Sequence, residues 1–216
     1  MMSLMHRVQL DLSGADISFT APLSLSANLN QGAVLVSDMF KLYRFENMLY
    51  RMNLSGEEMK AYLEFAAGLW FNTMNGPGDH LLLLREEGSG RLANPSFNCS
   101  SAAGIDYTID VSQEAGERVP IRGFTDGSSF EINETYNVPI NSHRGNGGGG
   151  HLTRGAGIPK EALTDRVNWS TDIDLRYYLM DHLMKQDTLE PILMDNWEVI
   201  PSPWVRSASR SDNKLF

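Results

Sequence analysis

The chain has 216 residues, of which 42% are hydrophobic and 21% charged, a composition typical of a globular domain with a sizeable core. Its 18 Lys and Arg against 27 Asp and Glu give a formal net charge of −9, and no basic run occurs, so we expect no nucleic acid as a partner. No apolar stretch approaches the roughly 20 residues that cross a bilayer, so we expect no membrane partner either.

The first third of the chain alternates short apolar runs with polar breaks, which predicts strands joined by irregular segments. The predicted elements are a strand over residues 8–12 (VQLDL), an extended segment over 17–25 broken by Pro22, a short strand over 34–36, a helical turn over 38–45 and a strand over 48–54. The opening residues run directly into this pattern without the apolar core of a signal peptide, so we expect an upstream part in a longer protein.

The clearest helix begins at Ser55. Ser55 and Glu58 have the spacing of a capping box, in which each side chain accepts a hydrogen bond from the other residue's backbone N–H. Met59 and Leu63 then begin an apolar stripe of helical period. This stripe favours a core-facing helix over an aromatic ligand site.

The rest of the chain contains closely spaced strands with polar turns, which favours antiparallel pairing over repeated βαβ units. The predicted elements are strands over 80–84, 105–111, 119–121, 136–140 and 197–200, a second helix capped by residues 171–174, and a loosely ordered polar tail over 207–216. We therefore predict an α+β fold with mixed, mainly antiparallel sheets and two main helices.

The residues that usually carry catalysis do not form a known pattern here. None of the five histidines has the His-Glu-x-x-His spacing, and neither Asp-x-His, Gly-Asn-His-Glu nor Gly-x-Ser-x-Gly occurs. The single cysteine, Cys99, excludes an intramolecular disulfide. His143 and His151 flank a glycine-rich loop and are candidates for a shared metal, but the glycines between them preorganise such a site poorly. We expect no catalytic residue, metal site or cofactor in this chain.

Residues 136–152 (YNVPINSHRGNGGGGHL) are the most unusual stretch. A strand carries His143 and Arg144 to a loop with five glycines within six residues, which favours positive φ angles or close approach of a ligand to the backbone. The loop matches G-x-G-x-x-G but is not predicted to open a helix, so a dinucleotide site is not supported. Two interpretations stay open, a ligand platform and a flexible hairpin loop.

Four segments in chain order carry a resemblance to a known family. They are YRFENML at 43–49 with the helix start at 54–56, IDYTIDVSQEAGERV at 105–119, the strand and glycine loop at 136–150, and DLRYYL at 174–179 with a closing tryptophan and proline end. Together they resemble the C-terminal domain of the 5′-nucleotidase / 2′,3′-cyclic-nucleotide phosphodiesterase family, in a Bacteroidetes-type version. The resemblance covers residues 8–204 and implies that domain's fold.

The resemblance implies a function in nucleotide catabolism. In that family an N-terminal calcineurin-like metallophosphoesterase domain holds two divalent metal ions and hydrolyses the phosphate ester, and the C-terminal domain binds the nucleoside. Residues 1–216 are then a single substrate-recognition domain of a periplasmic or secreted hydrolase, without the catalytic domain. The implied partners are a nucleoside or nucleotide and that N-terminal domain.

The resemblance also implies a site in which two rings stack on a base. Phe45 matches one ring, and His143 stands at the position of the second, where an imidazole stacks with less area than a phenylalanine. Asn47 matches an amide that contacts the base, and Asn146 lies in the loop beneath the ligand. The other predicted substrate-binding residues are Ser142, Gly148 and Gly149.

Two departures from the family affect ribose and phosphate recognition. The family's loop aspartate is Gly149 here, and its Asn-Gly-Gly-Gly-x-Arg segment is replaced by residues 13–18 (SGADIS), which lack the arginine. Each lost charged hydrogen-bonding group costs roughly 1.5–3 kcal/mol of interaction. Two alternatives therefore stay open: a stand-alone module for another aromatic or sugar-like ligand, and a scaffold whose glycine loop docks on a partner domain.

Overall fold

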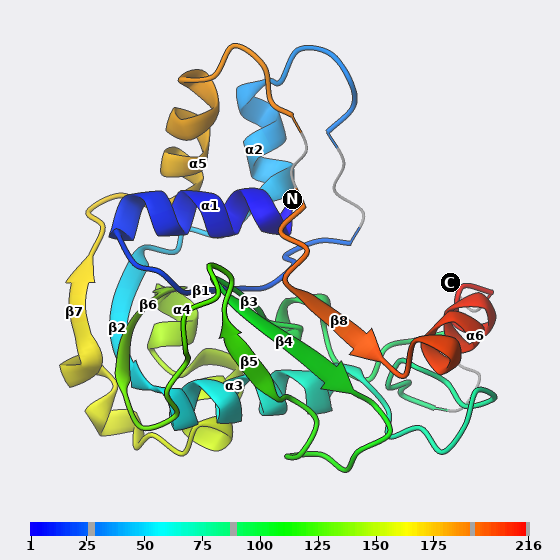
Figure 1. Cartoon of the computed structure of the whole chain (residues 1–216). Helices are drawn as coiled ribbons and strands as arrows, with labels where there is room; N and C mark the ends of the chain where they lie inside the picture. The colour runs from blue at the N-terminus through cyan, green and yellow to red at the C-terminus, as the bar shows by residue number, and fades with distance from the viewer. Residues whose placement is uncertain (26–28, 87–89, 191–192, 215–216) are drawn as a thin grey trace.

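The computed structural model describes residues 1–25, 29–86, 90–190 and 193–214, and within them the chain forms an α+β fold with one two-stranded and two three-stranded sheets (Figure 1). The main helices are α1 (Met2–Ser13), α2 (Val36–Leu42), α3 (Gly56–Trp70), α5 (Leu175–Met184) and α6 (Ser202–Asp212), with a short α4 (Ser142–Gly145). The strands are β1 (Ser18–Thr20), β2 (Leu49–Ser55), β3 (Ser101–Ala103), β4 (Ile105–Asp110), β5 (Ile121–Phe124), β6 (Thr135–Asn141), β7 (Val167–Ser170) and β8 (Trp197–Ile200).

The sheets are mixed and mainly antiparallel, as predicted. One sheet has the order β6-β2-β7 with antiparallel neighbours, and β1 pairs with β3 in the same sense. In the third sheet β4 lies between antiparallel β5 and parallel β8. Leu49 at the start of β2 lies opposite Asn141 at the end of β6. This register brings the residues before β2 and those after β6 to one edge of the sheet.

Helix α3 begins with the capping box that the sequence predicts. The Ser55 Oγ accepts from the Glu58 N–H at 3.1 Å, and the Glu58 Oε2 accepts from the Ser55 N–H at 2.8 Å. Met59 and Leu63 are buried. The interpretation of the stripe as core is therefore confirmed.

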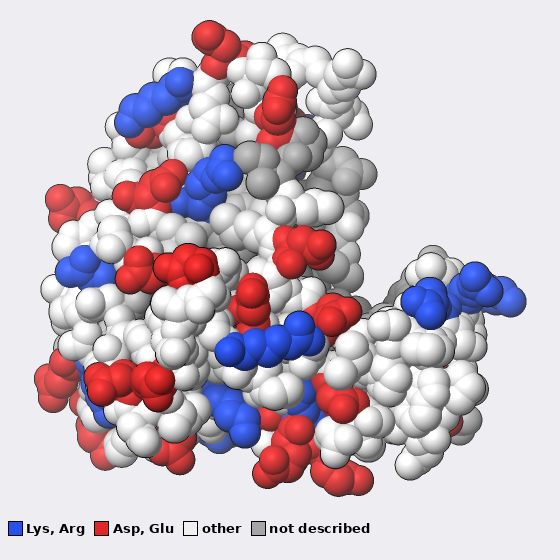
Figure 2. All heavy atoms as spheres, viewed as in Figure 1, with Lys and Arg blue, Asp and Glu red and all other residues white. Residues whose placement is uncertain are grey.

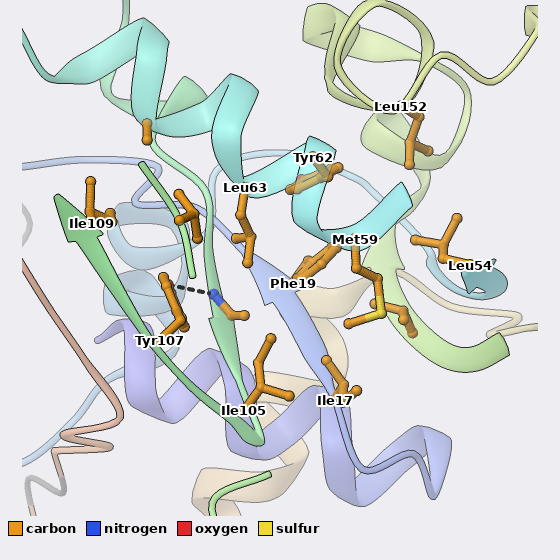
Figure 3. Packing of buried hydrophobic residues seen from close by; sticks show 14 of the residues in the cluster. Ile17, Phe19, Leu54, Met59, Tyr62, Leu63, Ile105, Tyr107, Ile109 and Leu152 are labelled. Carbon is orange, nitrogen blue, oxygen red and sulfur yellow. Dashed lines mark hydrogen bonds between the residues drawn. The ribbon is translucent and has the colours of Figure 1, made fainter. Parts of the chain in front are cut away.

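The main core lies between α3 and the sheets. The rings of Phe19 from β1 and Tyr62 from α3 stack with centroids 4.4 Å apart, and Ile105 and Tyr107 of β4 complete the layer (Figure 3). A second cluster joins α1, α2 and α5, which lie together at one end of the molecule (Figure 1). Phe45 and Phe97 pack against this second cluster from outside.

Residues 8–12 belong to helix α1, so the predicted strand is wrong. The spacing of Met5 and Val8, both buried, fits a helical face as well as the alternation fits a strand. The buried His6 is accommodated because its two ring nitrogens lie 3.1 Å from serine hydroxyls of β1 and β3. Gly14, with φ 63°, ends the helix in the left-handed conformation that favours glycine.

Residues 34–36 form no strand, because residues 34 and 35 lead into α2 and Val36 begins it. The apolar run 80–84 makes isolated bridges, Leu82 to Phe71 and Leu84 to Leu92, instead of a continuous strand. The strand predicted from residue 119 begins at Ile121.

Residues 207–212, expected in a loose polar tail, are the last part of helix α6. The reason is Asp212, which is buried and accepts hydrogen bonds from the N–H groups of Leu81 and Leu82 at 3.0 Å. Its other carboxylate oxygen lies 2.6 Å from the His80 Nδ1. Residues 215–216 of the expected tail lie outside the described residues.

The described helices include none long and apolar enough to span a membrane. On the face shown in Figure 2, Lys and Arg are scattered among Asp and Glu instead of gathering in one patch.

Candidate functional site

A cavity of about 190 Å³ lies at the edge where β2 begins and β6 ends. Its lining residues come from four segments of the chain and are Ala21, Leu23, Phe45, Asn47, Phe97, Asn141, His143 and Arg144. The register of Leu49 opposite Asn141 explains why residues almost 100 positions apart share this cavity. Phe45, Asn47 and His143, predicted from sequence as site residues, are thus brought together.

Ser142 joins the two sides of this edge. Its hydroxyl oxygen accepts from the Met48 N–H at 3.1 Å, and its own N–H donates to the Met48 carbonyl at 2.8 Å. Ser142 is not among the residues that line the cavity. Its contacts fix the distance between the segment of Phe45 and that of His143.

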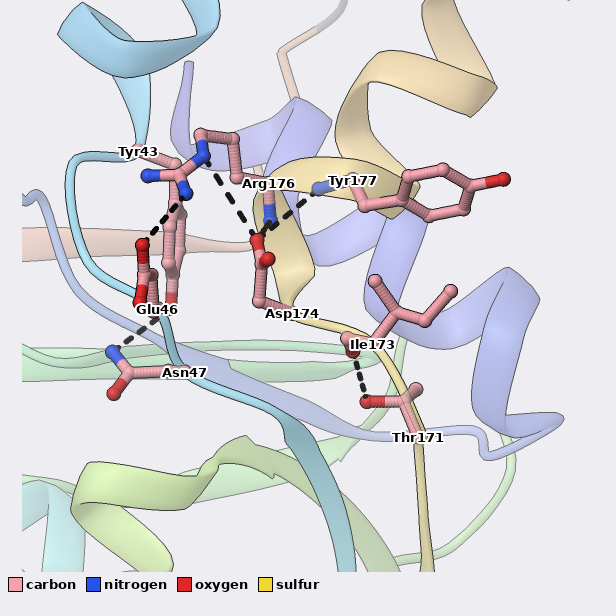
Figure 4. Close-up of polar contacts among 8 residues, drawn as sticks. All are labelled: Tyr43, Glu46, Asn47, Thr171, Ile173, Asp174, Arg176 and Tyr177. Atoms are coloured by element: carbon pink, nitrogen blue, oxygen red, sulfur yellow. Dashed lines mark hydrogen bonds and ion pairs between the residues drawn. The ribbon is translucent and has the colours of Figure 1, made fainter.

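The segment of Glu46 and Asn47 is held by the N-terminal end of helix α5 (Figure 4). The Asn47 carbonyl accepts from the Leu175 N–H at 2.8 Å, and the Asn47 Nδ2 donates to the Tyr43 hydroxyl at 3.3 Å. Burial raises the pKa of Tyr43 to about 12, so this hydroxyl stays protonated. Phe45 itself is half-buried, and the guanidinium carbon of Arg44 lies 4.9 Å from its ring centroid.

Asp174 connects the cap of α5 to the same segment. Its carboxylate accepts from the N–H groups of Arg176 and Tyr177, as expected for an N-cap. The Arg176 guanidinium then reaches Glu46 at 3.3 Å (Figure 4). The predicted cap over residues 171–174 thus also braces the segment between Phe45 and Asn47.

His143 lies in the first turn after β6 and lines the same cavity as Phe45. Asn141 caps this turn, because its Oδ1 accepts from the Arg144 N–H at 2.9 Å. Partial burial, followed by the charge of Arg144, holds the pKa of His143 below its usual value. The neutral form of its imidazole is therefore favoured.

Arg144 is buried beneath the glycine loop. It donates from Nη1 to the Gly148 carbonyl at 2.7 Å and from Nη2 to the Phe97 carbonyl at 2.5 Å and the Asn98 Oδ1 at 3.3 Å. None of the ion pairs found among the described residues involves Arg144. Burial lowers the pKa of its guanidinium. The positive charge is thus held by neutral acceptors.

The glycine loop is packed against these two side chains. A Cβ at Gly148 would collide with the imidazole of His143, and one at Gly149 would collide with the guanidinium of Arg144. Gly149 also has a left-handed backbone, with φ 72°. Both glycines therefore make room for neighbouring side chains, and the flexible-loop interpretation does not fit this packing.

Asn146 is exposed and does not line the cavity, and its backbone N–H donates to the Ser142 carbonyl at 2.9 Å. His151 is buried, with its Nε2 donating to the Asn98 carbonyl at 2.9 Å. Burial holds the pKa of His151 at about 3. In the part of the chain that the structure describes, no group of three or more His, Cys, Asp or Glu is arranged to hold a metal ion.

The sequence did not predict Phe97 as part of this site, and it placed Arg144 at the glycine loop without a role among the site residues. Phe97 lies 46 residues before His143 in a stretch without periodicity, so the sequence carries no signal that they meet. Asn141 had a usable signal, since an Asn three residues before Arg144 has N-cap spacing at the end of a strand.

Comparisons with known proteins agree with this fold. The family model described as the 5′-nucleotidase C-terminal domain matches residues 1–154. The trifunctional nucleotide phosphoesterase protein YfkN of Bacillus subtilis (strain 168) is 27% identical over 187 residues, which are 81% of this chain and 12% of that protein.

Solved structures share the fold over nearly the whole chain. A Staphylococcus aureus protein solved in complex with alpha-ketoglutarate has a TM-score of 0.71 at 23% identity, covering 90% of this chain and 35% of that one. A 5′-nucleotidase precursor from Thermus thermophilus has a TM-score of 0.68 at 22% identity, covering 93% and 35%. The NAD nucleotidase of Haemophilus influenzae has a TM-score of 0.63 at 16% identity, covering 90% and 32%. The chain thus spans about a third of each solved chain.

Proposed function

The chain belongs to the 5′-nucleotidase C-terminal domain family, and from this premise we propose that it is the substrate-recognition domain of a nucleotide phosphoesterase, holding a nucleoside base between Phe45 and His143. The observation that carries the proposal is that these two rings line one cavity of about 190 Å³ together with Asn47. Stacking of a base on an aromatic side chain contributes about 1–3 kcal/mol to binding, which is the loss measured when that side chain is replaced by alanine.

The electrostatics of the cavity suit an uncharged aromatic ligand. The described lining residues include no carboxylate, and the lowered pKa of His143 favours its neutral imidazole. The one guanidinium in the lining, that of Arg144, is bonded to carbonyl and amide oxygens of the chain. A neutral imidazole offers a flat face for stacking without the cost of desolvating a charge. Asn47 supplies an amide for the edge of the base.

Phosphoester hydrolysis belongs, in this proposal, to a metallophosphoesterase domain of the parent protein. That domain would hold two divalent metal ions, which would supply activation of the phosphate, and this chain would bind and orient the nucleoside. The nucleotide phosphoesterase of Bacillus subtilis, of which this chain matches 12%, supports a multidomain parent. A periplasmic or secreted location is part of the same proposal, supported by the description of the Thermus relative as a precursor.

The second candidate is a binding module that kept the fold and lost nucleotide recognition. Gly149 favours it, because a side chain at this position would collide with Arg144, so the ribose-binding carboxylate expected from the family has no space. A flat ligand other than a nucleoside would then occupy the cavity.

Isothermal titration calorimetry of this chain with adenosine, AMP and other nucleosides tests the proposal. We expect Phe45→Ala to weaken binding roughly 5- to 150-fold, corresponding to 1–3 kcal/mol. Tyr177→Ala is the matched control, because the Tyr177 ring is exposed on α5 and points away from Asn47 (Figure 4). Equal affinities for the two variants, or binding of a non-nucleoside aromatic alone, would favour the second candidate.

A further inference from the structure

We propose that Phe97 is a specificity-determining wall of this cavity, held in place by Arg144, and that it restricts the ligand to bases without bulky ring substituents. The proposal rests on the proposed function, because it concerns the same cavity. It adds a residue from a third segment to the two rings that the family resemblance implies.

The position of Phe97 is the first step. It lies in a single turn of 3₁₀ helix, Ser96–Asn98, just before β3, and its half-buried side chain packs on the second hydrophobic cluster beside Phe45. Phe97 lines the same cavity as Phe45 and His143 but comes from a segment outside the sheet edge that these two share. The cavity therefore has three ring-bearing walls.

The second step is the fixation of this turn. Arg144 links the Phe97 carbonyl and the Gly148 carbonyl through its two terminal nitrogens, at 2.5 and 2.7 Å. His151 binds the next carbonyl, that of Asn98, at 2.9 Å. A planar guanidinium donates in a fixed fork, so it sets the distance between the turn and the glycine loop. Arg144 is a positioning residue for Phe97.

The third step concerns the available space. A cavity of 190 Å³ is smaller than the roughly 300–1,000 Å³ typical of sites for drug-sized ligands, so it encloses a ring system and not a whole nucleotide. Gly148 and Gly149 pack against His143 and Arg144, so the glycine loop supports these two lining side chains. A substituent on the base then meets the ring of Phe97.

The experiment compares affinities for adenosine and for adenosines that carry a phenyl group at C2, N6 or C8, measured by calorimetry on the full chain. For the wild-type chain we expect adenosine to bind at least 10-fold more tightly than at least one of the enlarged analogues. In Phe97→Ala we expect that analogue to bind as tightly as adenosine or more so. Phe45→Ala should weaken all the ligands together, and Tyr177→Ala should change none.

Arg144→Lys tests the positioning role, since one ammonium cannot reproduce the fork. We expect the ratio of the affinities for adenosine and for the enlarged analogue to fall in Arg144→Lys, but less than in Phe97→Ala. In Arg144→Met this ratio should fall further than in Arg144→Lys. A role in stability alone would lower the melting temperature of the variant without changing this ratio. Melting temperatures without ligand verify that each variant is folded.

Two results would overturn the proposal in distinguishable ways. If binding depends on Phe45 but Phe97→Ala leaves every affinity ratio within two-fold of wild type, Phe97 sets no size limit and the proposed function stands. If the wild-type chain binds none of the nucleosides at millimolar concentration, the proposed function fails, and the assignment of Phe97 fails with it.

Discussion

The two sides of the cavity are held by different means. On one side, the antiparallel register of β2 and β6 places Phe45 and His143 through a series of backbone hydrogen bonds. On the other side, Phe97 depends on one buried guanidinium and one buried imidazole. In the sheet, many weak backbone contacts together position Phe45 and His143, whereas the position of Phe97 depends mainly on the side chain of Arg144. Single substitutions should therefore have larger effects around Arg144 than along the sheet edge.

The largest effect is expected for Arg144→Met. The substitution removes the donor from the Phe97 carbonyl, the Gly148 carbonyl and the Asn98 amide, and a buried acceptor without a partner costs about 1–3 kcal/mol. We expect the free energy of unfolding, measured by urea denaturation, to fall by about 3 kcal/mol. Arg154→Met is the control, because Arg154 is exposed and its bond to the Gly149 carbonyl is 3.3 Å long. Equal losses in both variants would contradict a special role for Arg144.

Gly149→Ala separates crowding by Arg144 from backbone strain. Gly149 and Gly157 have nearly the same φ, 72° and 71°, but a Cβ would touch Arg144 at Gly149 and nothing within 4 Å at Gly157. We expect Gly157→Ala to cost about 1 kcal/mol of unfolding free energy, from strain alone. Gly149→Ala should cost about 2–3 kcal/mol because Arg144 must also move. If thermal or urea unfolding gives the same loss for both, the loop is not packed on Arg144.

Acid should lower the stability of the fold through two buried histidines, one at helix α1 and one beside the turn of Phe97. Burial holds the pKa of His6, between α1 and the β1–β3 sheet, and of His151, beside Asn98, at about 3. In the unfolded chain the usual pKa is about 6.5, so the unfolded state binds more protons between pH 6.5 and 3. Stability is full above pH 6.5 and is lost as the pH falls, by about 1.4 kcal/mol per pH unit for each histidine.

Urea unfolding at pH 7, 6, 5 and 4.5 measures this dependence. We expect His6→Gln and His151→Gln each to reduce the slope below pH 6.5 by about 1.4 kcal/mol per pH unit. The His151 variant should also weaken the fixation of the Phe97 turn, while the His6 variant should not. A slope identical to that of the wild-type chain would mean that these histidines are protonated in the folded state.

The smallest effect is expected at the sheet edge itself. Ser142→Ala removes the acceptor of the Met48 N–H but leaves the backbone bond from the Ser142 N–H to the Met48 carbonyl. We expect a loss of about 1 kcal/mol in unfolding free energy and a small change in base affinity. A loss as large as that of Arg144→Met would show that the sheet edge is no more tolerant than the guanidinium contact.

This difference between the two sides also explains what the sequence could predict. Local patterns were sufficient for helix α3, whose capping box and stripe lie within residues 55–70, and for the alternating strands β2, β4 and β6. Residues 8–12 were assigned wrongly because alternation and helical spacing coincide over so few positions. The contacts of His6 with β1 and β3, which the helix makes possible, leave no pattern in the sequence.

The same limit applies to the site. Phe45, Asn47 and His143 were found because their segments resemble a known family, and the structure places all three in the cavity lining. Phe97 and the role of Arg144 could not be found, because they depend on contacts across 46 and 47 positions that leave no periodic trace. Asp212 is similar, since a polar C-terminal stretch gives no sign that one carboxylate is buried against residues 80–82.

The most direct test of base stacking between Phe45 and His143 is an NMR titration that follows the imidazole protons of His143 as adenosine is added, with the signals assigned from a His143→Gln variant. A base stacked on the imidazole shields these protons, so we expect them to shift upfield in the wild-type chain and to stay in place in Phe45→Ala at the same ligand concentration. The signals of His80 and His182, which do not line this cavity, should not move in either. Saturable binding of adenosine without a shift at His143 would contradict the stacking arrangement.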